Sequence, residues 1–146
     1  MLRGLIVGTA LMCGAVLPCA AAAASSFELH MIVPCGPQDR TYVLEGTSHE
    51  FCLAPDKVID ETGIVKAERY PVISRVIVDV TPAASDKLLA VSTQNVGNDL
   101  AVLFNGKLIF KATIDAPLKL DKFQLSLNNA PEQVDALVDA FPGPKT

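Results

Sequence analysis

The sequence predicts an α+β fold, a two-layer sandwich in which an antiparallel sheet carries two helices on one face. The first observation is the Asn105-Gly106 pair between two apolar segments, a strong signal of a β-hairpin. The second is a β-branched run at residues 72–80 followed by Thr81-Pro82, which predicts a strand and then a helix start. The third is an apolar stripe at helical spacing within residues 134–141. From residue 72 the order is strand, helix, strand, strand, strand, helix.

The beginning of the domain is predicted to form a small meander of three strands. In its first strand, Phe27, Leu29 and Met31 alternate onto one side. A turn that contains two prolines and a glycine follows this strand. The polar segment at residues 55–70 is expected to hold a short turn at residues 61–63 and little regular structure. The three strands are expected at residues 27–33, 41–46 and 49–54, with the first turn at residues 34–40.

The strand at residues 72–80 is predicted to bury one face, because its valines alternate with other residues, among them Arg75 and Asp79. A helix is expected over residues 82–95, with Gly97 just beyond it as a stop. The inner side of this helix is expected to carry Leu88, Val91 and Ser92.

The side chains of the hairpin are expected to form two faces, because successive side chains along a strand point to opposite sides. We expect the uniformly apolar face to lie in the core beneath the helices: Ala101, Leu103, Leu108, Phe110, Ala112 and Ile114. The other face is mixed: Leu100, Val102, Phe104, Lys107, Ile109, Lys111 and Thr113. A strand within residues 119–128, starting late near Phe123, and a helix over residues 130–141 complete the domain. The stripe of this helix consists of Val134, Leu137, Val138 and Phe141.

The start of the chain is predicted to be a secretory signal peptide, residues 1–24. Arg3 supplies a positive charge, residues 5–17 are apolar, and alanines occupy residues 20–24. The apolar run is too short for a membrane-spanning helix, which needs about 20 residues. We therefore expect a periplasmic protein whose mature chain has no transmembrane anchor.

The remaining sequence is expected to form one domain, residues 25–141, followed by a mobile tail, residues 142–146. The chain has a formal net charge of −4 and no basic cluster that could follow a phosphate backbone. Nucleic acid is therefore excluded as an expected partner.

Two cysteines, Cys35 and Cys52, remain after the signal peptide. An even pair in an exported protein indicates one disulfide, which stabilises a fold by about 3 kcal/mol for a loop of this size. The alternative is a metal site that combines both cysteines with His49. Zinc sites usually need closely spaced pairs of ligands, and only the pair His49 and Cys52 has that spacing, so the disulfide is favoured. His30, the second histidine, is expected at the surface or on an edge strand, as is His49.

Residues 95–118 resemble the head of the first periplasmic domain of SecD, a subunit of the bacterial preprotein translocase. The resemblance extends in order over residues 27–141, and only residues 95–117 carry specific motifs. The matching positions are Asn95-Val96-Gly97 at the helix end, Leu100-Ala101, Asn105-Gly106-Lys107 at a turn that usually reads Asp-Gly-Lys, Ile114 and Pro117.

The chain departs from that family at Lys111-Ala112, where the family often has Ala-Pro. The membrane-spanning segments of SecD and the base of its periplasmic domain are not matched. The resemblance thus implies a free-standing copy of the head fold in a bacterial periplasm, with a role in contacting other proteins. It supports translocase activity poorly, because function belongs to sites and not to folds.

No nucleophile motif occurs, and Asp56, Asp60 and Glu61 form the kind of acidic cluster that is usually solvated surface. We therefore expect no enzymatic activity, no cofactor and no metal. The expected function is a protein-interaction or accessory module of the envelope. The alternative is a small-molecule or metal binder that uses the loops between Cys35 and Asp60.

The mixed face of the hairpin supplies the candidate partner-binding residues Val102, Phe104, Lys107, Ile109 and Lys111. Two interpretations remain open. Either the first meander covers this face and completes the core, or the face is an exposed apolar patch for another envelope protein or a second copy.

Overall fold

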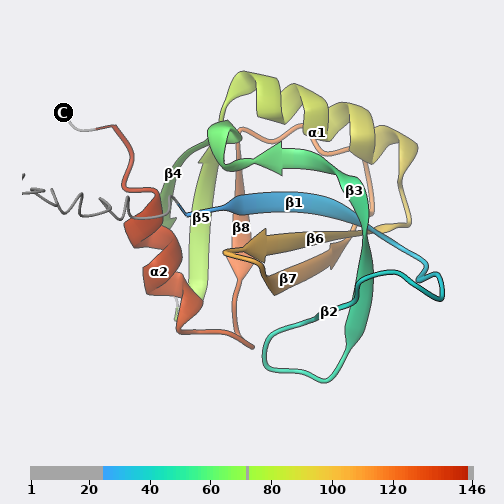
Figure 1. Ribbon diagram of the computed structural model, residues 1–146. Coiled ribbons are helices and arrows are strands. Elements are labelled where there is room, and N and C mark those ends of the chain that lie inside the picture. The colour runs from blue at the N-terminus through green and yellow to red at the C-terminus, as the bar shows by residue number, and fades with distance from the viewer. Residues whose placement is uncertain (1–24, 72, 145–146) are drawn as a thin grey trace, which may run out of the picture.

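The computed structural model describes residues 25–71 and 73–144, which form an α+β fold of two antiparallel sheets and two α-helices (Figure 1). The strands are β1 (Phe27–Val33), β2 (Tyr42–Val43), β3 (Glu50–Asp60), β4 (Ile64–Arg69), β5 (Arg75–Val80), β6 (Asp99–Phe104), β7 (Lys107–Thr113) and β8 (Lys122–Ser126). The helices are α1 (Pro82–Gln94), α2 (Gln133–Ala140) and the short 3-10 helix η1 (Glu61–Gly63). The signal-peptide prediction, Val72 and the last two tail residues lie outside the described residues.

The strands pair into a five-stranded sheet in the order β2-β3-β1-β6-β7 and a three-stranded sheet in the order β4-β5-β8. The main core joins both sheets: Phe27, Val102 and Phe104 come from the large sheet, and Val76 and Val78 from the small one. Helix α1 packs along β3, and α2 packs against β4 and β5 (Figure 1). The prediction of one sheet with two helices on one face is therefore corrected, because a second sheet forms much of the opposing layer.

A second, smaller apolar cluster forms around β6 and β7. Ala101, Leu103 and Leu108 are buried there, packed against five partly buried side chains. These five are Ile32, Tyr42, Leu44, Phe51 and Leu53. Strand β2 lies below β7 in Figure 1. Leu44, which follows β2, forms an isolated bridge with Leu108 of β7. The inner strands of the large sheet are thus covered on both faces.

The hairpin turns at Asn105-Gly106 as predicted, with φ of 50° and 80°, the left-handed values that a two-residue turn of this type requires. The pairing then changes, because Leu103 pairs with Leu108 while Val102 pairs with Phe110. Ile109 is therefore an extra residue on β7, a β-bulge. This bulge divides the face that the sequence predicted to be uniform.

The consequence is a correction of the hairpin faces. Ala101, Leu103 and Leu108 belong to the small cluster and do not lie beneath the helices. Phe110 and Ile114 instead contact the main core, because the bulge changes the alternation of β7 after Leu108.

The segment at residues 55–70 is more regular than predicted. It continues β3, forms the expected turn as η1, and then forms β4. Between His30 paired with Lys57 and Ile32 paired with Leu53, β3 contains more residues than β1. Pro55 lies in this irregular stretch, where a residue without an N–H is tolerated. The expectation of little regular structure here was wrong.

The other elements agree closely with the prediction. The Thr81 side chain caps α1 by accepting a hydrogen bond from the Ala84 amide at 3.2 Å. Strand β8 starts late, as expected, and β5 buries Val76, Val78 and Val80 on one face. In α2, the whole predicted stripe contacts the core: Val134, Leu137, Val138 and Phe141.

Candidate functional site

The apolar residues of the predicted partner face are part of the core. Val102, Phe104 and Ile109 are 0 %, 1 % and 2 % exposed. They belong to the cluster that joins the two sheets, so the small sheet and helices cover them, and the first meander does not. Lys107 is exposed at the turn, and the Lys111 Nζ lies 2.9 Å from Asp99 Oδ2. The hypothesis of an exposed apolar patch on these residues is therefore corrected.

A different apolar site lies between the two sheets, where β7 of the large sheet and β8 of the small one contribute to the same cavity. This cavity has a volume of about 190 Å³. Its inner wall includes the buried side chains Leu29, Leu88, Leu100 and Leu125. A molecule that enters would meet hydrocarbon on nearly every side. We call this feature the inter-sheet cavity.

Four large, partly exposed apolar side chains also line the inter-sheet cavity: Phe110, Leu118, Leu120 and Phe123. Because they are partly exposed, they connect the cavity lining to the molecular surface. Thr113 and Gln124 are the polar residues in the lining. Such a cavity with a few polar groups at its border is typical of a binding site.

The connection between β7 and β8 supplies part of the lining of the inter-sheet cavity and is hydrogen-bonded to α1. The Leu118 amide donates to the Oγ of Ser92 at 2.8 Å, and that hydroxyl donates to the Leu89 carbonyl of α1. Ser92 is completely buried, as its predicted place on the inner side of the helix requires. The segment that supplies Leu118 and Leu120 is thereby fixed against α1.

Both strands beside the inter-sheet cavity are edge strands of their sheets. In the described part of the chain, no strand pairs with the outer edge of β8. The outer edge of β7, opposite β6, has only the isolated bridge near the start of the strand. There Leu108 bridges to Leu44, and its carbonyl accepts from the Glu45 amide at 2.9 Å. Free strand edges can accept a further strand from another polypeptide.

Sequence reasoning identified the parts of this site without joining them. It assigned Phe110 to the core and noticed that the apolar spacing slips between Leu120 and Phe123. That slip is the signal that could have indicated the site, because Leu120 precedes β8 and both side chains line the cavity.

The disulfide between Cys35 and Cys52 is confirmed, with a Cα–Cα distance of 5.2 Å and a sequence separation of 17. Cys52 is buried in β3, and Cys35 is exposed after β1. Both sulfur atoms are used in the bridge, so the alternative metal site with His49 loses its thiolate ligands. In the residues that the structure describes, no group of three His, Cys, Asp or Glu residues could hold a metal ion.

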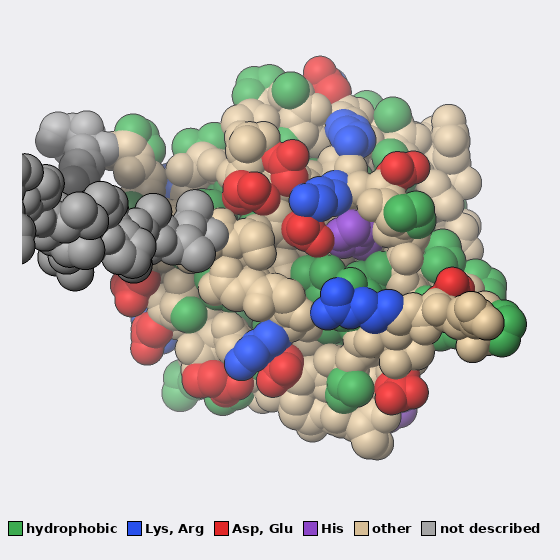
Figure 2. All heavy atoms as spheres, viewed as in Figure 1, with side chains coloured by type: hydrophobic (Ala, Val, Ile, Leu, Met, Phe, Trp, Pro, Cys, Tyr) green, Lys and Arg blue, Asp and Glu red, His purple; other side chains and the backbone are tan. Residues whose placement is uncertain are grey.

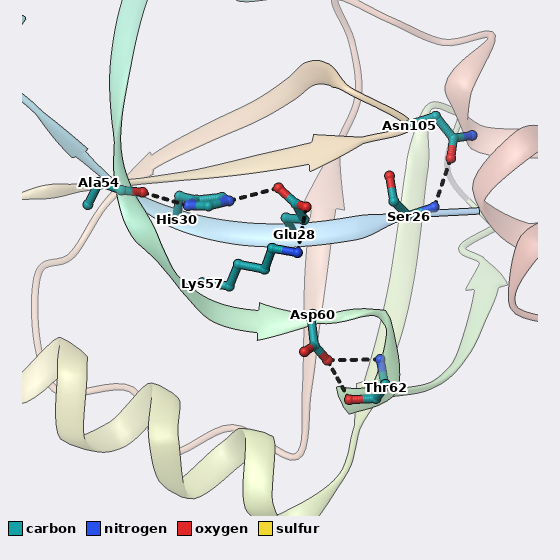
Figure 3. Close-up of polar contacts among 8 residues, drawn as sticks. All are labelled: Ser26, Glu28, His30, Ala54, Lys57, Asp60, Thr62 and Asn105. Carbon is teal, nitrogen blue, oxygen red and sulfur yellow. Dashed lines mark hydrogen bonds and ion pairs between the residues drawn. The ribbon is translucent and has the colours of Figure 1, made fainter. Parts of the chain in front are cut away.

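A polar cluster joins β1 to β3 across the irregular pairing (Figure 3). The ring nitrogens of His30 lie 2.7 Å from the Ala54 carbonyl oxygen and 2.9 Å from the Glu28 carboxylate. The Lys57 Nζ lies 2.9 Å from the other oxygen of Glu28. Contrary to prediction, His30 is buried, with 6 % exposure.

Burial raises the pKa of Glu28, but the hydrogen bonds from Lys57 and His30 outweigh it, so this pKa lies below its ordinary value. The same pair raises the pKa of Lys57. A hollow of about 480 Å³ adjoins this cluster and includes Asp39 and Arg40 in its lining. Basic and acidic side chains alternate over this side of the molecule (Figure 2).

The alternative function of the loops between Cys35 and Asp60 gains no support from these contacts. His30 and Lys57 are both paired with Glu28. Asp60 accepts hydrogen bonds from the amide and hydroxyl of Thr62, which lower its pKa and begin η1 (Figure 3). These side chains fix the backbone of β1, β3 and η1.

Among the described helices, none is long and apolar enough to span a membrane. No protein-family model matches the sequence, and no curated protein sequence matches it. Two solved structures share the fold. One is described as the membrane component SecDF that enhances protein export, and the other is SecDF in a super-membrane-facing form.

Each SecDF structure is 12 % identical in sequence and matches with a TM-score of 0.60 over 80 % of this chain. The match covers 61 % of the first SecDF chain and 18 % of the second, so this chain spans less than two thirds of either. The resemblance of the sequence to a SecD periplasmic domain is thus confirmed at the level of the fold, and this chain has the fold of that part of SecDF.

Proposed function

We propose that this chain is an exported, non-enzymatic accessory module of the bacterial envelope that binds other polypeptides. The observation that carries the proposal is the inter-sheet cavity, an apolar site bordered by two strand edges. The SecDF-like fold supports the same conclusion, since the matched SecDF structure is described as enhancing protein export.

The size and lining of the inter-sheet cavity suit a single large apolar side chain. A dry apolar cavity of about 150 Å³ accommodates a benzene molecule, and the volume here is about 190 Å³. Burial of a Leu or Phe side chain contributes about 1.5–3 kcal/mol. This gain is too small for tight binding and suits a transient contact.

The strand edges would supply the remaining affinity and the orientation. A partner in extended conformation can hydrogen-bond to the free edge of β8 while one of its side chains enters the cavity. Because alternate side chains of an extended segment point to opposite sides, such a partner would present an apolar residue at every second position.

Export is supported by the disulfide, because disulfides persist in oxidising compartments such as the periplasm. The sequence pattern at residues 1–24 supports the same localisation.

Leu120→Gln tests the proposal, because it places a polar amide in the lining of the inter-sheet cavity. Binding of a fluorescein-labelled ten-residue peptide that alternates Leu and Thr would be measured by fluorescence anisotropy with the full mature chain. We expect the wild-type chain to bind and Leu120→Gln to bind at least tenfold more weakly, about 1.4 kcal/mol.

Ile73→Gln is the matched control, because Ile73 is 86 % exposed and is not in the cavity lining. It removes a similar side chain and should leave binding unchanged. Circular dichroism melts would establish that both variants are folded. Equal affinity of a folded Leu120→Gln chain, or no binding by the wild-type chain, would contradict the proposal.

A further inference from the structure

We infer that a polypeptide bound at the inter-sheet cavity joins the three-stranded sheet as a fourth strand, antiparallel to β8 and centred on Gln124. This inference rests on the proposed function. It adds the direction and register of the bound segment, and the kind of residue that the segment must have at alternate positions.

The inter-sheet cavity meets β8 at the outer edge of the strand. Its lining includes three consecutive residues of β8, which are Phe123, Gln124 and Leu125. Because successive side chains of a strand point to opposite faces, a cavity that touches all three must reach an edge of the strand. The other edge of β8 is paired with β5. The cavity therefore extends to the place where a further strand would be added.

The pairing with β5 determines which backbone groups of β8 are already used. At one end of the pairing, the Val80 amide donates to the Asp121 carbonyl at 2.9 Å, and at the other end the Leu127 amide donates to the Ser74 carbonyl at 2.7 Å. The register between these ends has no irregularity. In an antiparallel pair, every second residue directs its N–H and C=O toward the neighbouring strand. The odd-numbered residues from 121 to 127 are therefore the ones bonded to β5.

The remaining residues of β8 direct their backbone groups away from β5. These residues are Lys122, Gln124 and Ser126, and their side chains are exposed. Within the described residues, no hydrogen bond to another backbone group uses their outward N–H or C=O groups. They therefore provide a row of donors and acceptors for an added strand.

The opposite edge of the same sheet is already occupied. The Ala67 amide of β4 donates to the Phe141 carbonyl at 2.8 Å, and α2 packs against β4. In the small sheet, β8 is thus the edge that a partner can use.

The antiparallel direction continues the pattern of both sheets, whose strand pairs in the described residues are all antiparallel. Antiparallel pairing is also slightly more stable per residue than parallel pairing. In this direction, the partner residues opposite Lys122, Gln124 and Ser126 exchange backbone hydrogen bonds with β8. Their side chains lie on the exposed face of the sheet, because directly paired residues share a face.

The alternate residues of the partner have the opposite role. Opposite Phe123 and Leu125, their side chains point to the inter-sheet cavity and their backbone groups point away from β8. The bound segment is therefore extended, with apolar residues at the positions that face the cavity. Proline is excluded from the positions between them, because those positions need a backbone N–H.

Two isomeric peptides test this inference with the full mature chain. Both are the fluorescein-labelled ten-residue peptide of alternating Leu and Thr, N-methylated either on every Thr or on every Leu. The Leu side chains occupy the cavity, so the Thr amides face β8. Methylation of Thr should weaken binding at least tenfold, since it removes the donors and places methyl groups between the strands. Methylation of Leu should leave the affinity of the unmodified peptide unchanged.

The outcomes distinguish this inference from the proposed function. No binding of the unmodified peptide would contradict the proposed function itself. Binding that is weakened equally by both methylations, or by neither, would overturn strand addition while the cavity remains a binding site. Loss on methylation of Leu alone would overturn the antiparallel direction, because in a parallel pair the cavity-facing residues direct their amides to β8.

Gln124→Pro tests the same hydrogen bond from the side of the protein. It removes the outward amide and keeps the bonds to β5, and edge strands accept proline where the N–H faces solvent. Gln124→Ala is the matched comparison, because it removes the same side chain and retains the amide. Gln124→Pro should bind the unmodified peptide at least tenfold more weakly than Gln124→Ala. Equal affinity of the two variants, both shown by circular dichroism to be folded, would overturn the inference, and the methylated peptides decide it without any change to the protein.

Discussion

At the residue scale, Gly46 and Gly97 both adopt positive φ, 75° and 91°, yet their surroundings differ. A Cβ at Gly46 would lie 2.2 Å from the carbonyl oxygen of Asn129. A Cβ at Gly97 would meet nothing within 4 Å. Gly97 is therefore needed for its backbone conformation alone, while Gly46 also permits close approach of two chain segments.

Gly46→Ala should consequently cost more stability than Gly97→Ala. The left-handed conformation alone costs an L-residue about 1–2 kcal/mol, which is the loss expected for Gly97→Ala. Gly46→Ala must also displace backbone, so we expect a loss of about 3 kcal/mol or more in the free energy of unfolding. Urea titrations followed by circular dichroism measure both. Equal losses would show that the Asn129 contact relaxes without cost.

Single residues with local chemistry were the most predictable features of this chain. Asn105-Gly106 specifies its turn through the φ values it tolerates, and Thr81 caps α1 through its own hydroxyl. The Cys35–Cys52 disulfide could be predicted because two cysteines remain after the predicted signal peptide and an exported protein is expected in an oxidising compartment. For the turn and the cap, the cause lies in the side chain or its sequence neighbours. His30 was unpredictable because its partners Ala54 and Glu28 converge only after β1 and β3 pair.

At the element scale, strand irregularities limited the prediction. Within residues 107–114 the apolar positions Leu108, Phe110, Ala112 and Ile114 alternate without interruption, so the sequence contains no mark for the extra residue Ile109 on β7. That one residue decides whether Phe110 faces the small cluster or the inter-sheet cavity. Strand β4 was missed because Glu68 and Lys66 look like loop residues, although they face outward from an edge strand.

Strands β1 and β3 are joined across their irregular pairing by the Glu28–Lys57 ion pair, which makes their stability depend on pH. The pKa of Glu28 is lowered in the folded chain from an ordinary value of 4.5. Below that value the unfolded state binds more protons than the folded state. The contribution of Glu28 is therefore complete above pH 4.5 and is lost as the pH falls through the folded pKa.

Glu28→Gln should thus lower the urea midpoint at pH 7, and its effect should shrink as the pH falls below 4.5, because protonation of the folded carboxylate progressively removes the ion pair. Urea titrations of both chains at several pH values measure the difference. Lys66, which pairs with Glu68 on β4, offers a matched control, because Glu68→Gln removes a similar ion pair at an exposed position. A Glu28→Gln effect that does not shrink at any pH below 4.5 would contradict the ionic origin.

At the scale of the whole molecule, the element order from β5 to α2 was correct and the layer arrangement was not. Order follows from local patterns, but the division into two sheets depends on which strands pair over long separations. Strand β1 pairs with β6, whereas β8 pairs with β5. These choices separate β7 from β8 and create the inter-sheet cavity between them, so the site could not be derived from either strand alone.

The two ends of the described domain meet through Phe27 of β1 and Phe141 after α2. Their ring centroids are 6.1 Å apart in an edge-to-face arrangement. The Phe141 carbonyl also accepts a hydrogen bond from the Ala67 amide of β4 at 2.8 Å. One residue therefore connects the large sheet, the small sheet and α2, which predicts that unfolding of these parts is coupled.

A double-mutant cycle with Phe27→Leu and Phe141→Leu measures this coupling, since both changes keep an apolar side chain. Aromatic pairs contribute about 0.5–1.5 kcal/mol beyond burial, so we expect a coupling energy of about 1 kcal/mol in the free energy of unfolding. The control cycle combines Phe27→Leu with Phe123→Leu, and its losses should add within about 0.5 kcal/mol. Additive losses for Phe27 and Phe141 would mean that burial alone holds the two ends together, because only a direct interaction between the rings produces a non-additive term.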